Sequence, residues 1–124
     1  MSEKTKENEI VSPMIIVDPE DGREYTLEFT VKSVKKTEAA GFVATKIDEQ
    51  PMIMVPLLFW GAFQAHHPWV SREKAEKLLT EGLGGLEEEE LDRLGSLYAN
   101  PYKAIIRNEN GENPANPRKV TVKL

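Results

Sequence analysis

The feature that most constrains the fold is a strongly apolar stretch from Met52 to Ala65. It contains no charged residue, and apolar side chains would occupy every side of a helix formed by it. Such a helix lies in the centre of a domain or is covered by a partner. The stretch is shorter than the roughly 20 residues that a bilayer span needs. We therefore expect Met52–Ala65 to be a buried core helix.

Two prolines leave the start of this helix open. Pro51 suits the first helical position, where a missing N–H costs nothing. Pro56 either lies in the first turn of a helix that begins later or kinks a helix that begins at Pro51. The segment His66–Pro68 is expected to end the helix.

A β-hairpin is expected before the apolar stretch. The short apolar run Met14–Val17 is followed by the turn-forming residues Asp18–Gly22. From Tyr25 to Phe29, large apolar residues then alternate with polar ones, which is typical of a half-buried strand. One face of the hairpin therefore needs to be covered by other elements.

Three more helices are predicted from capping signals. Thr30 is a suitable N-cap for a helix over Val31–Ala40, and Ser71 is one for a helix over Arg72–Glu81. Four acids, Glu87–Glu90, then fit the first turn of a last helix, where the helix dipole favours negative charge. The inner stripe of this last helix is expected to include Leu91, Leu94 and Tyr98.

The chain is long enough for one core, and we predict a single α+β domain over residues 13–107. In it, an N-terminal β-hairpin packs on about four helices. Residues 1–12 are expected to form a flexible arm, and residues 108–124 a flexible tail. The alternating segment Lys119–Leu124 is either a third strand beside the hairpin or an extended tail.

The composition excludes several classes of chemistry. There is no cysteine, which rules out disulfides, thiolate metal sites and a cysteine nucleophile. The net charge is −5, and no basic cluster predicts a nucleic-acid or membrane partner. The first ten residues lack the apolar core of a signal peptide, so we expect a cytoplasmic protein.

No motif predicts a catalytic residue, a cofactor site or a metal site. The adjacent pair His66–His67 points about 100° apart on a helix, so a polar helix end is the favoured interpretation, with a small metal-dependent factor as the alternative. The run Gly82–Gly85 lacks the Lys-Ser/Thr of a phosphate-binding loop. No serine has the flanking glycines of a nucleophile elbow.

Aromatic residues are concentrated around the apolar stretch. Phe59, Trp60, Phe63 and Trp69 fall within eleven residues. Each is a core candidate, but exposed aromatic side chains are also common anchors for partner proteins. We take Trp60, Phe63 and Trp69 as candidate partner-binding residues.

The order of these elements resembles a family of small proteins from phage and prophage tail regions of Gram-positive bacteria. The resemblance covers about residues 24–104. It is carried by the strand Tyr25–Phe29, by Glu38 to Phe42, by the series Pro51–Phe59, Gly61–Phe63, His66–His67, and by Leu97–Pro101. The layout is also similar to that of tail assembly chaperones of long-tailed phages.

This resemblance implies a non-enzymatic protein that binds the long, hydrophobic tape-measure protein before the tail tube forms around it. Self-association is compatible with that role. The alternative is a structural tail or connector subunit that stays in the finished particle. The resemblance implies no catalytic residue.

Overall fold

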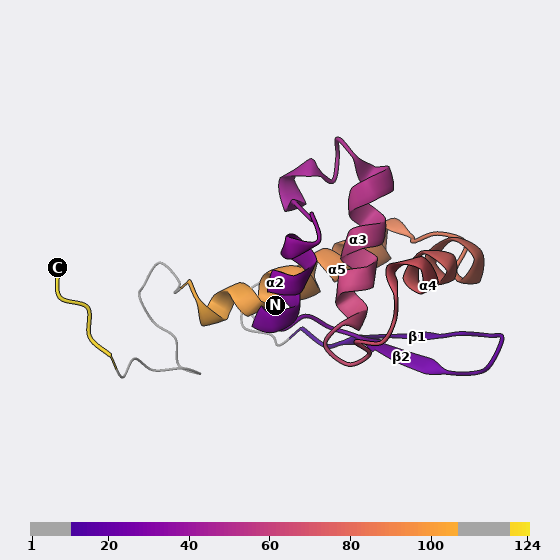
Figure 1. Ribbon diagram of the computed structural model, residues 1–124, viewed down its shortest axis with the longest axis horizontal. Coiled ribbons are helices and arrows are strands. Elements are labelled where there is room, and N and C mark those ends of the chain that lie inside the picture. The colour runs from indigo at the N-terminus through magenta and orange to yellow at the C-terminus, as the bar shows by residue number, and fades with distance from the viewer. Residues whose placement is uncertain (1–10, 107–119) are drawn as a thin grey trace, which may run out of the picture.

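The computed structural model describes residues 11–106 and 120–124 (Figure 1). Within these residues it contains a two-stranded antiparallel hairpin and four α-helices, which confirms the predicted α+β class. The elements in chain order are β1 (Met14–Val17), β2 (Glu24–Leu27), α2 (Val31–Ala39), the short 3₁₀ turn η1 (Ala44–Lys46), α3 (Pro51–Phe63), α4 (Arg72–Lys77), the π-helical turn η2 (Leu78–Gly82), α5 (Glu88–Ala99) and the 3₁₀ turn η3 (Asn100–Ala104).

The hairpin closes through the predicted Asp18–Gly22 turn. The amide of Asp18 donates to the carbonyl of Arg23 at 2.8 Å, and Gly22 takes a positive φ of 73° that glycine adopts without strain. The register pairs Ile16 with Tyr25, so both side chains point to the core. β1 and β2 form the whole sheet in the described residues.

The third-strand alternative is wrong for the part of it that the structure describes, because residues 120–124 form no strand. Residues 1–10 of the predicted arm and residues 108–119 of the predicted tail, including Lys119, lie outside the described residues. Apolar and polar residues do alternate in this segment. A segment with this pattern becomes a strand only where its backbone forms hydrogen bonds with a neighbouring strand.

Helix α2 begins where the capping signal predicts. The Thr30 side chain accepts from the Ser33 amide at 3.1 Å, and the Ser33 hydroxyl accepts from the Thr30 amide at 2.8 Å. This reciprocal capping box satisfies two amides that the first turn leaves unpaired. The helix ends at Ala39, one residue before the predicted end, and Gly41 follows it with a φ of 114°.

Helix α3 begins at Pro51 and contains Pro56 in its interior, so the earlier of the two predicted starts is the observed one. It ends at Phe63 rather than at Ala65. Its middle and last turns are buried, whereas Met52, in the first turn, is 87% exposed. Within the described ranges, no helix is long and apolar enough to cross a membrane.

The last two predicted helices differ from expectation mainly at one junction. The predicted helix Arg72–Glu81 is α-helical only to Lys77 and then widens into the π-helical turn η2. Ser71 caps its start as predicted, accepting from the Lys74 amide at 3.0 Å. Helix α5 begins at Glu88, and its four-acid start includes a capping box between Glu87 and Glu90.

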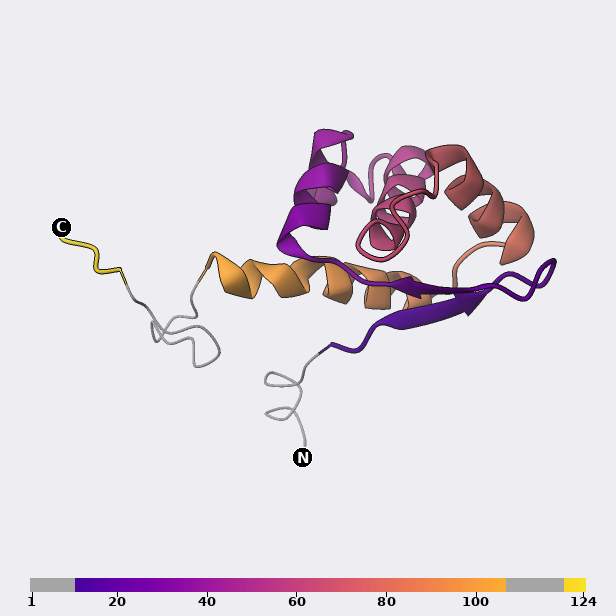
Figure 2. The same cartoon turned by 60° about the horizontal axis from the view of Figure 1, so that its bottom comes forward.

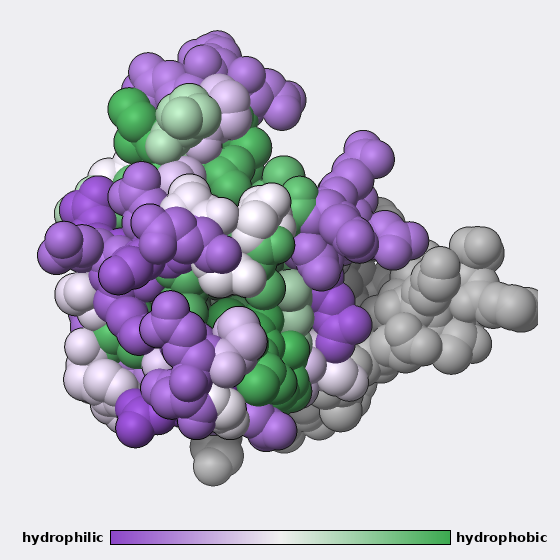
Figure 3. Space-filling view, turned by 90° about the vertical axis from the view of Figure 1, so that its right-hand side faces the viewer, coloured by the Kyte–Doolittle hydropathy of each residue, from purple (hydrophilic) through white to green (hydrophobic). Residues whose placement is uncertain are grey.

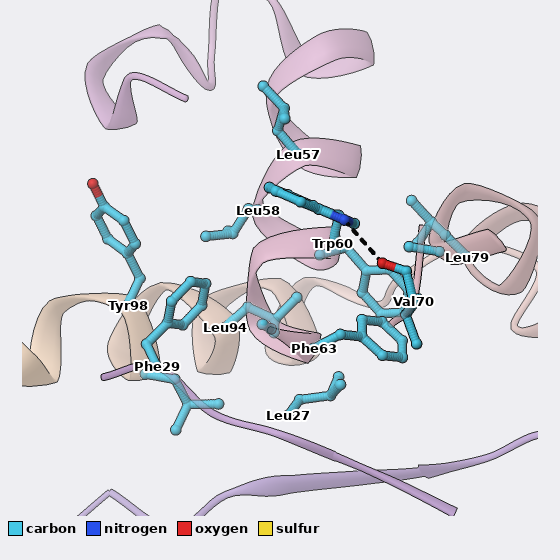
Figure 4. Close-up of a cluster of buried hydrophobic side chains, with 14 of the residues drawn as sticks. Leu27, Phe29, Leu57, Leu58, Trp60, Phe63, Val70, Leu79, Leu94 and Tyr98 are labelled. Atoms are coloured by element: carbon cyan, nitrogen blue, oxygen red, sulfur yellow. Dashed lines mark hydrogen bonds between the residues drawn. The ribbon is translucent and has the colours of Figure 1, made fainter. Parts of the chain in front are cut away.

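Helices α2, α3 and α4 lie on the same side of the hairpin, and α5 crosses α3 (Figures 1 and 2). Buried side chains of α3 meet Leu27 and Phe29 of the hairpin segment and Leu94 of α5 in one cluster (Figure 4). Trp60 joins this core, and its indole N–H donates to the Val70 carbonyl at 3.2 Å. Helix α3 is therefore the centre of the domain, as its all-round apolar sequence predicts.

Candidate functional site

A groove with an apolar floor lies between η1, α3 and α5. Its cavity volume is about 520 Å³. The floor is formed by Leu58 of α3, with the half-buried Ile47 and Leu91 beside it. The remaining lining residues are Asp48, Asp92, Gly95, Ser96 and Ala99.

Helix α5 supplies one wall of the groove because its two faces differ. Leu94, Leu97 and Tyr98 are buried against the core. The next face carries Gly95, Ser96 and Ala99, whose side chains are too small to fill the space above Leu58. A Cβ added at Gly95 would meet no heavy atom within 4 Å, so the groove is open at that point. Small residues of this kind allow the backbone of another helix to approach closely.

The comparison with known families then gives one match over the entire sequence. A family described as a domain of unknown function, DUF5055, matches residues 1–124. The chain belongs to this family. No curated protein and no solved structure matches it.

The structure separates the three aromatic residues that the sequence grouped as candidate partner contacts in this DUF5055 domain. Phe63 is fully buried and packs edge-to-face on Tyr25, with ring centroids 5.3 Å apart. Trp60 is buried as well, so neither side chain is an exposed anchor in this fold. Phe63 thus packs α3 against β2, whereas the Trp60 indole N–H donates to the Val70 carbonyl in the segment after α3. Trp69 is 63% exposed and remains a surface candidate.

A second exposed apolar region lies at the start of α3. Met52 is 87% exposed and Ile53 is 56% exposed, and both line a cavity of about 200 Å³ against Arg72 and Glu76 of α4. On the face of the DUF5055 domain that carries α4, hydrophobic surface shows between hydrophilic side chains (Figure 3). The cavity here is smaller than the groove at α5, and the charged side chains of Arg72 and Glu76 border it.

A third cavity, also of about 200 Å³, lies between the hairpin turn and α4 and is mostly charged. Asp18 is buried there and forms an ion pair with Lys74 at 3.7 Å. The carboxylate also accepts from the Glu20 amide at 3.0 Å. These partners account for the buried charge, so we assign this cavity a role in holding the turn against α4.

The two histidines serve separate contacts at the end of α3. His66 Nε2 lies 2.6 Å from Glu28 Oε1, whereas His67 Nε2 accepts from the Thr26 amide at 2.9 Å. The ring nitrogens thus point to different partners, and the ring centroids are 6.3 Å apart. No group of three or more potential metal ligands occurs in residues 11–106 and 120–124. The geometry therefore gives no support to a shared metal site.

The His67 contact fixes the tautomer of that ring. Because Nε2 accepts a hydrogen bond, the proton of the neutral ring sits on Nδ1, which is buried and has no partner in the described residues. Burial lowers the pKa of His67 below its ordinary value of 6.5, and the nearby His66 and Arg23 lower this pKa further. The neutral ring is the form that holds β2 against the end of α3.

Acidification is expected to destabilise the domain through His67. The unfolded chain binds a proton more readily than the folded one, because the folded pKa is lowered. The stabilisation is thus complete above the ordinary histidine pKa and is lost as the pH falls through the lowered pKa. Urea unfolding at pH 7.5 and 5.5 measures the difference. His67→Gln should show a smaller decrease than the original chain, and an equal decrease would contradict the assignment.

The groove residues were not among the sequence-predicted site residues. The sequence does show Gly95, Ser96 and Ala99 at helical spacing, which places three small residues on one face of α5. That signal marks a face without bulky side chains. It does not reveal that Ile47 and Leu58, which precede Gly95 by more than thirty residues, form the floor beneath it.

Proposed function

We propose that this DUF5055 protein is a non-enzymatic phage or prophage tail assembly chaperone that binds the tape-measure protein. The observation that carries the proposal is the open groove floored by Leu58 and bordered by small residues of α5. Grooves of this form accept the apolar face of a helix, whose side chains enter at spacings of three and four residues. The long, hydrophobic client expected from the sequence resemblance offers such faces.

The charges around the groove bear on the kind of helix it accepts. Two acidic residues lie in its lining: Asp48, which follows η1, and Asp92, in the first part of α5. They favour a client helix that carries Lys or Arg beside its apolar stripe, and they disfavour an acidic one. The exposed Trp69 provides a second contact outside the groove. All of these contacts are binding contacts, and the proposal assigns no catalytic residue.

The proposed role places the protein in the cytoplasm of the bacterial host, where tails are assembled. The most direct test is co-expression with the tape-measure-like protein encoded nearest downstream. Size-exclusion chromatography then measures whether the two proteins co-elute and whether the long partner stays soluble. A complex supports the chaperone role. If the partner aggregates as it does when expressed alone, the chaperone role is contradicted. If this protein is retained in finished particles, a structural subunit is favoured instead.

Ser96→Arg is expected to weaken the client complex at least tenfold, or about 1.4 kcal/mol. Ser96 is exposed and lines the groove, so an arginine there fills the space that a client side chain would occupy and leaves the core unchanged. Fluorescence anisotropy with a labelled client peptide measures the dissociation constant.

Thr80→Arg is the matched control for this change. Thr80 is also an exposed residue in a helical segment, but it lies in η2, outside the groove lining. The substitution adds the same charge and the same bulk. Equal loss of affinity in the two variants would mean that the groove is not the client site, and the contact would then be sought at Trp69.

A further inference from the structure

The two outer edges of the hairpin differ in whether other parts of the fold form hydrogen bonds with their backbone. On the outer edge of β2, the Thr26 amide donates to His67 Nε2, and the Glu28 amide, just beyond β2, donates to the Ala62 carbonyl at 2.9 Å. The segment at the end of α3 thus satisfies the backbone donors along this edge. No added strand can pair there without displacing these contacts.

In the described residues β1 itself has no such cover on its outer edge, although just before it the Pro13 carbonyl accepts from Arg93 Nη2 at 3.2 Å. Antiparallel pairs alternate between hydrogen-bonded and non-hydrogen-bonded, and Asp18 forms a bonded pair with Arg23. By this alternation, the backbone N–H and C=O of Ile16 also point toward β2. The backbone groups of Ile15 and Val17 therefore point away from β2. Their side chains are each 52% exposed. β1 contains no charge and no proline, the usual features that prevent pairing at an edge.

The segment Val120–Leu124 has the properties of a strand that lacks a neighbour. Val120, Val122 and Leu124 alternate with polar residues, and all three are exposed. The segment lies at the opposite end of the molecule from the hairpin turn (Figures 1 and 2). Its β-branched residues favour extended backbone, yet it forms no strand within its own chain.

The charges of the two segments are complementary. Lys123 lies within the segment, and the sequence places Arg118 and Lys119 directly before it. The turn that follows β1 carries the exposed acids Glu20 and Asp21. A strand running antiparallel to β1 would bring its basic beginning to this acidic turn, whereas a parallel strand would not.

We propose that Val120–Leu124 of a second copy of this chain adds to the outer edge of β1 as an antiparallel third strand. Addition of an extended segment to an open edge gives affinity through main-chain hydrogen bonds. Because each copy has both one segment and one open edge, reciprocal exchange makes a closed dimer. The proposal does not depend on the tail-assembly role, since it uses neither the groove nor a client.

Disulfide trapping in the full chain tests the pairing, because the chain has no cysteine of its own. Ile15→Cys and Val122→Cys chains are mixed and oxidised, and the products are separated by mass. We expect the disulfide between one Ile15→Cys and one Val122→Cys chain, at twice the chain mass of 14.0 kDa, and its exact mass lies between those of the two symmetric disulfides. The matched control replaces Ile15→Cys with Ile105→Cys, which is an exposed apolar position away from the hairpin and should cross-link at least tenfold less.

Two further measurements decide between the possible occupants of the edge. Sedimentation equilibrium should show a dimer that is lost in Val122→Pro, because proline removes a strand amide at a position that is exposed within its own chain. A chain carrying both Ile15→Cys and Val122→Cys should also give the dimer. An intramolecular disulfide at 14.0 kDa, or equal cross-linking by Ile105→Cys, would overturn the proposal.

Discussion

Replacing Leu58 with aspartate is expected to unfold the domain. Leu58 is 1% exposed and sits where α3 faces α5. The change removes a buried leucine side chain, which costs about 2–5 kcal/mol in large-to-small core substitutions. It also buries a carboxylate without a partner, at a further cost of several kcal/mol. The total approaches or exceeds the roughly 5–15 kcal/mol of a typical domain. Circular dichroism and urea unfolding measure the outcome, and Leu57→Asp should behave in the same way.

Ile53→Asp is the control on the same helix. Ile53 is more than half exposed in the first turn of α3, where the new carboxylate stays in water and near the positive end of the helix dipole. We expect a folded protein whose stability changes by less than about 1 kcal/mol. A cooperatively folded Leu58→Asp protein would show that the core does not lie on this face of α3.

Gly61→Ala is expected to destabilise the domain by about 3 kcal/mol or more, the upper range for overpacking a core. A Cβ at this position would lie 2.2 Å from Thr37 Oγ1 and 2.7 Å from its Cγ2. Thr37 is fully buried on α2, and its hydroxyl donates to the Ser33 carbonyl at 2.7 Å. The side chain cannot turn away without giving up that bond, so α2 and α3 must separate. The midpoint of urea unfolding reports the loss.

Gly95→Ala is the matched control, because the same change is made at a helical glycine with no atom within 4 Å of the new Cβ. Alanine is a better helix former than glycine by up to about 1 kcal/mol, so this variant should be as stable as the original or more stable. Adding Thr37→Ala to Gly61→Ala removes the two closest atoms and should recover part of the loss. Equal stability of Gly61→Ala and the original chain would contradict the close packing of α2 on α3.

The parts of the fold that could be predicted are those with local causes. The N-cap at Thr30, the acids at the start of α5 and the turn after β1 each depend on a few neighbouring residues, and each appears where predicted. The buried position of α3 follows from its lack of a polar face. The widening of α4 into η2 was missed, since no proline or glycine precedes it to interrupt the helical pattern.

The candidate site was predicted less well because it depends on contacts between distant segments. Whether Trp60 or Trp69 is exposed depends on the segment after α3, because its Val70 carbonyl accepts from the Trp60 indole N–H while Trp69 stays 63% exposed. Likewise, Gly95 becomes part of a groove only because Ile47 and Leu58 come to lie beside it. A single sequence gives the character of each face, and the tertiary fold decides which faces meet.

The central place of α3 also has a consequence during translation. When α3 leaves the ribosome, β2 and α2 are already made, but α4 and α5, which cover its remaining sides, are still to be synthesised. At elongation rates of about 5–20 residues per second, this interval lasts a few seconds. Through that time the most apolar helix of the nascent chain is only partly covered and prone to aggregate. The domain therefore completes its folding late, once α5 has emerged.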